Sequence, residues 1–486
     1  MSKPAFTDRT RPRFRDPPHL SSGRSSVTCM TDTDLSKTQT PAMRGFAGAV
    51  AALRAGVDTP RAYLERCIEA IETWEPRIGA FVATNFDGAR AAADRSTARW
   101  KSGAPLSALD GMPVGIKDIM ETADMPTEQG SPLFAGWRGG RDGAAVAALR
   151  GAGAVIVGKT VTTEFAATEP RGTCNPWDIS RTPGGSSSGS AAAVSAGLVP
   201  VALGTQVIGS ILRPASFCGV YGYKPSVGGI NRGGSFDGFS QSCTGVLAAT
   251  LEDTWITARV IAARAGGDAG SPGISGPLEP PPAKTPRRLA LLETAGWSTA
   301  SDEAIGALRQ ALDRLKAAGI EIVDKDSDEA VAAAEAAIAD AVAISRAINA
   351  WESRWPLNTY ARDMDRTKLS AGMLERLETA EKMDQEEYAG LLERRRSVRE
   401  TYARLAADCD ACITLSASGP APVGLQSTGN PAFAIPSSLL GTPALTMPLL
   451  KAEGLPLGLQ MIGFADRDAA LFAAAAACEG TLRAGK

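Results

Sequence analysis

Histidine is almost absent from this chain. Its 486 residues include a single histidine, His19, which lies in an N-terminal stretch rich in Pro, Ser and Arg. A Ser-His-Asp triad, a Cys-His pair and a His-ligated metal centre all need a histidine on a rigid scaffold, and a polar leader does not provide one. Acid–base chemistry in this protein must therefore use Lys, Asp, Glu, Tyr or Ser.

Cysteine is sparse and widely spaced. Among the eight cysteines, only Cys409 and Cys412 form a CxxC pair. A zinc site needs a second such pair or histidines at metal-ligand spacing. We therefore expect no metal ion and no other cofactor, and we expect ordinary thiols of the kind found in a reducing cytoplasm.

Long apolar runs and a large net charge are also missing. No stretch approaches the roughly 18 consecutive apolar residues of a membrane-spanning helix. The formal net charge is −2 and the isoelectric point is near 5.8. Electrostatics therefore gives no reason to expect nucleic acid or a membrane surface as a partner.

The chain divides into a leader and one large domain. Residues 1–42 are polar and Pro-rich, which predicts disorder, and residues 43–486 form the domain. Thr59 followed by Pro60 is typical of a helix start, and apolar residues then recur at helical spacing (Leu64, Cys67, Ile68 and Ile71). A second helix is expected at about residues 87–101.

Strands and helices alternate in the next part of the chain. We expect a strand at 113–119 that carries Lys117, a helix at 143–150 and a strand at 154–158. The segment 158–160 is predicted to turn into the next helix. This alternation favours an α/β fold with a covered, parallel or mixed sheet.

A helix-rich stretch interrupts this pattern. Residues 302–318, 330–355 and 385–408 have helical periodicity and many charge pairs four residues apart. We interpret residues 285–410 as a helical insertion that caps one side of the α/β domain. Strands are expected to return at 411–416 and 444–448, followed by a closing helix at 467–482.

The segment 183–190 reads PGGSSSGS and allows three interpretations. A phosphate-binding loop requires GxxxxGK[ST], but Ser190 occupies the lysine position. A flexible linker does not normally adjoin an apolar helix inside a folded region. The third interpretation is a catalytic loop, which is supported by the later sequence GTQVIGS at 204–210. Ser210 follows a glycine turn, where a nucleophile finds an exposed oxygen and nearby backbone N–H groups.

A serine nucleophile needs a base, and Lys117 is the natural candidate. It lies in an apolar strand, where burial disfavours the charged ammonium and lowers the lysine pKa. The alternative is a structural lysine paired with Asp118 or Glu121.

Several motifs together resemble the amidase signature family. They recur in the family's order from about residue 45 to 482 and read GIKD around Lys117, EFA at 164–166, NPWD at 175–178, PGGSSSGSAAAVSAGLVPVALGT at 183–205, GS at 209–210, PASFCGVYGYKPS at 214–226 and PLGLQMIG at 456–463. The resemblance implies a single large α/β domain, with a mixed, twisted central sheet covered by helices.

The resemblance also implies a Ser-cisSer-Lys triad. By motif, Ser210 is the nucleophile, Ser186 is the bridging serine after an expected cis peptide bond, and Lys117 is the base. The backbone N–H groups of Val207, Ile208 and Gly209, with that of Ser210, are expected to form the oxyanion hole.

The nucleophile loop departs from the commonest family pattern, which resembles GTDTGGSIR. Gln206 and the displaced Arg213 are similar to a malonamidase-like branch, in which such an arginine holds a substrate carboxylate. The alternative is an arginine that ties the loop to an acidic residue. Ile208 stands where a small residue is usual, and a β-branched residue tolerates a positive φ poorly.

The resemblance implies an amidase that hydrolyses a C–N bond of a small-molecule linear amide through an acyl-enzyme. The alternatives are a transamidating relative, like one component of the tRNA-dependent amidotransferase, and a non-catalytic binding module. The expected partner is the amide substrate, with a homodimer as an option.

Overall fold

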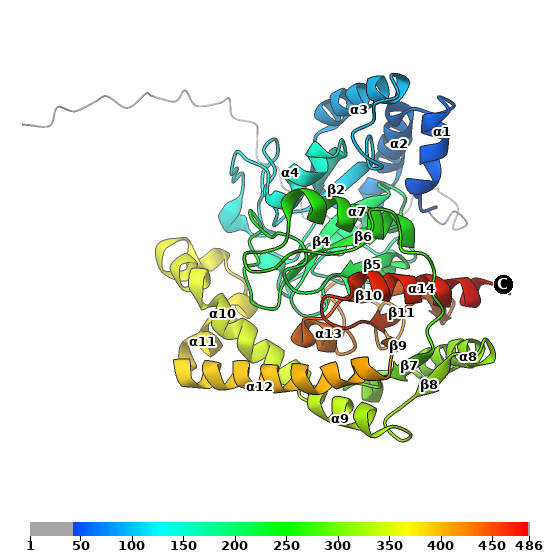
Figure 1. The fold of residues 1–486 in the computed structure, drawn as a ribbon. Coiled ribbons are helices and arrows are strands. Elements are labelled where there is room, and N and C mark those ends of the chain that lie inside the picture. The colour runs from blue at the N-terminus through cyan, green and yellow to red at the C-terminus, as the bar shows by residue number, and fades with distance from the viewer. Residues whose placement is uncertain (1–41, 485–486) are drawn as a thin grey trace, which may run out of the picture.

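A mixed sheet forms the centre of the molecule (Figure 1). The computed structural model describes residues 42–484, so all but the last residue of the expected leader lies outside the described part. In that part the sheet has 11 strands in the order β1-β3-β2-β4-β6-β5-β10-β11-β9-β7-β8. The pairs β3–β2, β2–β4, β9–β7 and β7–β8 are parallel and the other pairs are antiparallel. The α/β fold with a mixed sheet is confirmed.

The strands are β1 (Phe81–Thr84), β2 (Pro113–Lys117), β3 (Val155–Thr160), β4 (Val201–Gln206), β5 (Tyr221–Lys224), β6 (Cys243–Ala248), β7 (Arg288–Leu291), β8 (Glu321–Val323), β9 (Ala411–Leu415), β10 (Ala444–Ala452) and β11 (Leu455–Ile462). The α-helices are α1 (Val50–Arg54), α2 (Pro60–Ile78), α3 (Phe86–Lys101), α4 (Ala144–Gly151), α5 (Ser188–Ser195), α6 (Leu212–Cys218), α7 (Leu251–Ala265), α8 (Asp302–Ala317), α9 (Glu329–Ile338), α10 (Ala341–Asp363), α11 (Ala371–Lys382), α12 (Gln385–Ala403), α13 (Ile435–Leu440) and α14 (Asp468–Arg483).

The start of α2 follows the predicted signature. The side chain of Thr59 accepts a hydrogen bond from the backbone N–H of Ala62, and Pro60 occupies the first helical position. The apolar residues that defined the periodicity are all buried: Leu64, Cys67, Ile68 and Ile71. Local capping and burial of one face therefore fix this helix together.

The segment 158–160 differs from its prediction. Strand β3 continues to Thr160 because it pairs with β2 on one side and β1 on the other. Lys159 can lie inside the strand because its ammonium, which is fully buried, pairs with Asp118 at 3.0 Å. The predicted turn into a helix is wrong, since a charged residue in a strand was taken as a break.

The stretch 285–410 contains strands as well as helices. Strands β7 and β8 extend one edge of the sheet, while α9 to α12 gather beside it in Figure 1. The predicted helix at 330–355 is two helices, because α9 ends at Ile338 and α10 begins at Ala341. Within α10, Trp355 leaves the helical conformation (φ −104°, ψ 131°) because it precedes Pro356.

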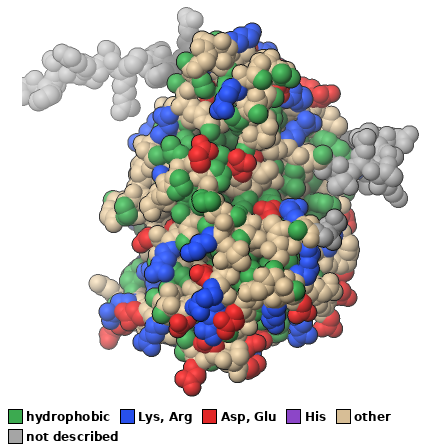
Figure 2. All heavy atoms as spheres, turned by 45° about the vertical axis from the view of Figure 1, so that its right-hand side comes forward, with side chains coloured by type: hydrophobic (Ala, Val, Ile, Leu, Met, Phe, Trp, Pro, Cys, Tyr) green, Lys and Arg blue, Asp and Glu red, His purple; other side chains and the backbone are tan. Residues whose placement is uncertain are grey.

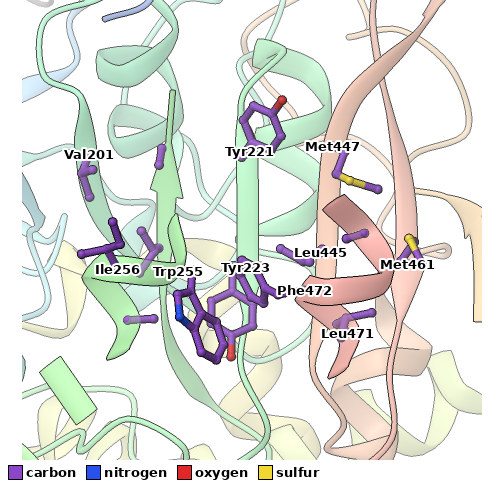
Figure 3. Packing of buried hydrophobic residues seen from close by; sticks show 14 of the residues in the cluster. Val201, Tyr221, Tyr223, Trp255, Ile256, Leu445, Met447, Met461, Leu471 and Phe472 are labelled. Carbon is purple, nitrogen blue, oxygen red and sulfur yellow. The ribbon is translucent and has the colours of Figure 1, made fainter. Parts of the chain in front are cut away.

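Apolar packing on the sheet involves α7 and α14. Phe472 of α14 contacts Tyr223 of β5 and Trp255 of α7, with ring centroids 4.8 Å apart in both pairs (Figure 3). All three side chains are buried. The strands that carry the site are thus supported by a rigid apolar layer.

The remaining expectations concern surface, membrane, metal and thiols. Basic and acidic side chains are interspersed on the face shown in Figure 2. Between residues 42 and 484 no helix is both long and apolar enough to cross a bilayer, and no cluster of three or more His, Cys, Asp or Glu side chains suits a metal ion. Six cysteines of this part are free, but Cys174 is disulfide-bonded. The expectation of thiols is wrong at Cys174, since an isolated cysteine gives no sign of its partner in the sequence.

Candidate active site

Lys117 ends the central strand β2 and contacts two hydroxyl groups. Its Nζ donates to Ser186 Oγ at 2.8 Å and to Thr205 Oγ1 at 2.9 Å. All three side chains are buried. Because β2 and β4 are parallel neighbours, Lys117 and Thr205 lie towards the carboxyl ends of adjacent strands. The sheet therefore delivers the lysine to the serine loop.

The ionisation of Lys117 is strongly perturbed. Burial lowers the pKa of its ammonium to about 7, and the charge of Asp237 opposes this shift. The carboxylates next to it in sequence have other partners: Asp118 pairs with Lys159, and Glu121 pairs with Arg141. Lys117 has no ion pair among residues 42–484, so the alternative of a structural lysine paired with Asp118 or Glu121 is wrong.

The loop before α5 is shaped by its glycines. Gly184 has a φ of +82°, and the peptide bond between Gly185 and Ser186 is cis, as the family resemblance implied. A Cβ on Gly189 would lie 2.2 Å from the carbonyl oxygen of Ala80, so only glycine fits there. The loop is packed against β3 and is neither a linker nor exposed, and it points Ser186 towards Lys117.

The second serine loop is held by Gln206. The buried side chain of Gln206 accepts hydrogen bonds from the N–H groups of Ile211 (2.9 Å) and Leu212 (3.0 Å), and it donates to Ser438 Oγ at 3.0 Å. Ser438 in turn donates to the carbonyl oxygen of Ile208 at 3.1 Å. The turn that presents Ser210 is therefore fixed from both ends.

Ser210 lies where the buried groups meet a cavity. The backbone N–H of Ser187 donates to the carbonyl oxygen of Ser210 at 3.3 Å, which joins the two serine loops. In the described part of the chain the hydroxyls of Ser186 and Ser210 form no mutual hydrogen bond. Such contacts are often long in ligand-free enzymes and shorten when substrate binds.

The expected oxyanion-hole residues line the same cavity. Val207, Ile208 and Gly209 lie beside Ser210 at its wall. Their N–H groups and that of Ser210 donate to no acceptor within residues 42–484. Ile208 is not among the residues with positive φ, and its side chain packs against a neighbouring apolar cluster. The backbone difficulty expected at Ile208 is therefore not met.

The cavity has a volume of about 660 Å³. Its lining comes from the serine loop, from the segment 166–169, from α10 and α11, and from the segment 426–431. A cavity of this size suits a small organic molecule. Lys117 and Ser186 do not line it, so they are reached from the cavity only through Ser210.

Arg213 is a buried cation at the cavity wall. Its guanidinium donates to the carbonyl oxygen of Gly185 at 2.6 Å and to Thr428 Oγ1 at 2.9 Å, while its Nε has no partner. Burial lowers the pKa of the guanidinium to about 10, which leaves it charged at neutral pH. The described residues place no carboxylate in an ion pair with it, so the alternative of an acidic tie is wrong.

Sequence reasoning missed two supporting residues. Thr205 accepts a hydrogen bond from Lys117, and Gln206 anchors the serine loop. Both belong to the GTQ segment, but the sequence marked Gln206 only as a departure from the family pattern. Their roles depend on contacts with β2 and α13, which local sequence does not reveal.

Comparison with known proteins agrees with this geometry. The Amidase family model matches residues 62–472. The chain is 33% identical over 467 residues to the A component of the glutamyl-tRNA(Gln) amidotransferase of Chloroflexus aurantiacus, with 85% of this chain and 92% of that protein covered.

Two solved structures share the fold. One is a chain of a complex described as vestigial and as revealing the origins of an s-triazine catabolic enzyme (TM-score 0.79, 25% identity, 90% and 98% coverage). The other is the peptide amidase of Stenotrophomonas maltophilia (TM-score 0.75, 25% identity, 91% and 97% coverage). Because the family model and the sequence relative both span most of the chain, this protein belongs to the amidase family.

Proposed function

We propose that this protein hydrolyses the C–N bond of a small-molecule linear amide through an acyl-enzyme on Ser210. The observation that carries the proposal is the fully buried Lys117, whose pKa is near 7 and whose Nζ donates to Ser186 directly behind the cavity. A neutral amine in that position is a general base matched to neutral pH. A binding module would need neither a neutral buried lysine nor a serine relay.

Acylation follows from the order of these groups. Ser210 Oγ attacks the amide carbonyl carbon while its proton passes to Ser186 Oγ, and the proton of Ser186 passes to Lys117 Nζ. The N–H groups of the segment 207–210 stabilise the negative charge on the carbonyl oxygen. When the C–N bond breaks, Lys117 returns the proton through Ser186 to the leaving amine.

Deacylation uses the same relay. Water attacks the acyl carbon, its proton travels through Ser186 to Lys117, and the returning proton restores Ser210 Oγ as the acid leaves. No step needs a metal ion or cofactor, because lysine supplies the base and the backbone supplies the electrophilic contact. Each group returns to its starting protonation state after one turnover.

Arg213 is proposed to hold a carboxylate of the substrate near the scissile carbonyl. Its guanidinium has a free Nε and no acidic partner in the described part of the chain, and a guanidinium matches a carboxylate in a two-point contact. Arg213→Leu should lower kcat/KM for carboxylate-bearing amides by about 2–3 kcal/mol and leave neutral amides nearly unchanged. Equal losses for both substrate types, or a lower melting temperature, would assign Arg213 to structure.

A transamidating role is the second candidate, because the sequence relatives are amidotransferase components by name. Such a component works within an assembly, whereas the proposed enzyme works alone. The purified chain should therefore release ammonia or amine from carboxylate-bearing amides without any partner. Light scattering on the same preparation tests whether the active species is a homodimer. Work in a cytoplasmic setting is part of the proposal and is supported by the free buried thiols.

The decisive experiment is covalent labelling with a fluorophosphonate probe. The wild-type protein should be labelled at Ser210, and Ser210→Ala should abolish both labelling and hydrolysis without changing the melting temperature. Ser427→Ala is the matched control, since Ser427 lines the same cavity but has no contact with Lys117. Labelling of Ser210→Ala at the wild-type level would refute the assignment of the nucleophile.

A further inference from the structure

The cavity wall opposite the serine loop belongs to α10 and α11, which pack against each other (Figure 1). On α11 the lining residues are Gly372, Glu375, Arg376 and Thr379, and the spacing of three, four and seven places them on one helical face. On α10 the lining residues are Arg346, Ala347, Asn349 and Ala350. This wall is therefore formed by two regular helices.

Arg376 has an unusual environment for a cation. Its side chain is partly buried, and it also lines a small adjoining cavity whose wall includes Phe165, Phe239 and Tyr360. Within residues 42–484 it forms no ion pair and no hydrogen bond. Removal from water lowers its pKa from the usual arginine value, but a guanidinium remains charged at neutral pH. A cation that is withdrawn from water without a partner carries a desolvation cost that an anionic ligand would offset.

The other polar groups of this wall leave Arg376 uncompensated. Arg346 lines the cavity from α10 at an exposed position and lacks an ion pair among the described residues. Asn349, which is 2% exposed, adds a neutral amide whose oxygen has no partner. The two carboxylates of the lining, Glu169 and Glu375, are exposed, where water screens their charge. Arg376 is therefore the least screened charge on this wall, and it is positive.

We propose that Arg376, assisted by Arg346, forms a second anion-binding subsite, so that the substrate is an amide with two anionic groups. This inference rests on the proposed function: Arg213 takes the carboxylate near the scissile carbonyl, and the α10–α11 wall takes a second carboxylate farther along the molecule. The cavity volume of about 660 Å³ accommodates such a molecule. Amides with one carboxylate or none leave Arg376 unpaired, and they bind more weakly.

The test measures binding without turnover. In the Ser210→Ala background, calorimetry compares linear dicarboxylates of four to eight carbons with monocarboxylates of the same lengths. At least one dicarboxylate should bind about tenfold or more tightly than its monocarboxylate partner, as expected for added charged hydrogen bonds. If no dicarboxylate binds more tightly than its monocarboxylate partner, the subsite is refuted.

Substitutions then locate the second contact. Arg376→Met keeps most of the length of the side chain and should weaken dicarboxylate binding about tenfold while leaving monocarboxylates unchanged. Arg376→Lys should restore part of the loss, and it provides a charged variant if the methionine variant does not fold. Arg404→Met is the control, because Arg404 is exposed and lies outside the cavity lining. Equal weakening of both ligand classes, or unchanged dicarboxylate binding in both Arg376 variants, would overturn the proposal.

Binding and catalysis fail separately in this design. If no amide is hydrolysed and Ser210 is not labelled, the proposed function is refuted, while the calorimetry still reports on the α10–α11 wall. If hydrolysis occurs but dicarboxylates show no preference, the enzyme stands and the second subsite is refuted.

Discussion

Replacing Lys117 by methionine separates the chemical role of this residue from its cost to stability. The ordinary lysine pKa of 10.5 falls to about 7 in the folded protein because of burial. Between these two values the unfolded chain binds more protons than the folded chain, so wild-type stability rises with pH. At about 1.4 kcal/mol per pKa unit, burial of Lys117 costs about 5 kcal/mol at pH 6 and about 2 kcal/mol at pH 9.

Methionine removes this cost together with two hydrogen bonds, to Ser186 and Thr205. The loss of those bonds changes little with pH, whereas the relief of ionisation does. Lys117→Met should therefore gain stability relative to the wild type, and the gain should be about 3 kcal/mol larger at pH 6 than at pH 9. Its hydrolytic activity should fall by at least about 10²-fold, the scale of general-base catalysis.

Urea denaturation at both pH values measures the stability difference, with Lys284→Met as an exposed control. A matching signature is expected in wild-type kinetics: kcat/KM rises about tenfold per pH unit below pH 7 and levels off above it, as the fraction of neutral lysine grows. A stability gain that is the same at pH 6 and pH 9 would refute the lowered pKa. So would a rate that does not change between pH 6 and pH 8.

Three further predictions concern the two serine loops. Ser186→Ala should reduce turnover by about 10²–10⁴-fold, and its combination with Lys117→Met should be far less than multiplicative in steady-state kinetics because both belong to one relay; independent losses would contradict the relay. Gln206→Leu leaves the N–H groups of Ile211 and Leu212 without their acceptor, so it should lower stability by about 1–3 kcal/mol and slow labelling of Ser210, which unchanged labelling kinetics would disprove. Gly189→Ala places a Cβ 2.2 Å from the oxygen of Ala80 and should cost about 1–3 kcal/mol in thermal unfolding; an unchanged melting temperature would show that the loop can shift freely.

Local sequence carries much of the site because its groups belong to short motifs. The glycines around Ser186 and the turn before Ser210 are visible as composition, and the lack of histidine leaves lysine as the base. The partners of the neighbouring charges were not predictable. Asp118 pairs with Lys159 rather than with Lys117, because strand pairing brings β3 beside β2, and no sequence periodicity encodes that choice.

The fold shows the same division. Capping at Thr59 and the period of the apolar residues predicted α2, since both are local. The short strands β7 and β8 were not predicted, because three or four residues give no alternation to recognise. The break in α10 at Trp355 was missed although Pro356 signals it. The role of Arg376 was also not predictable, because its lack of a partner is a property of the packed molecule.

The supply of residues to the cavity has an evolutionary consequence. The groups proposed to break the amide bond lie in one continuous part of the chain, from Lys117 to Arg213, whereas the opposite wall comes from α10 and α11, more than a hundred residues later. Substitutions in those two helices can therefore remodel ligand choice while the reaction centre stays intact. Exchange of the segment 341–382 between relatives is a direct route to enzymes with new selectivity, and divergence within the family can proceed by the same path.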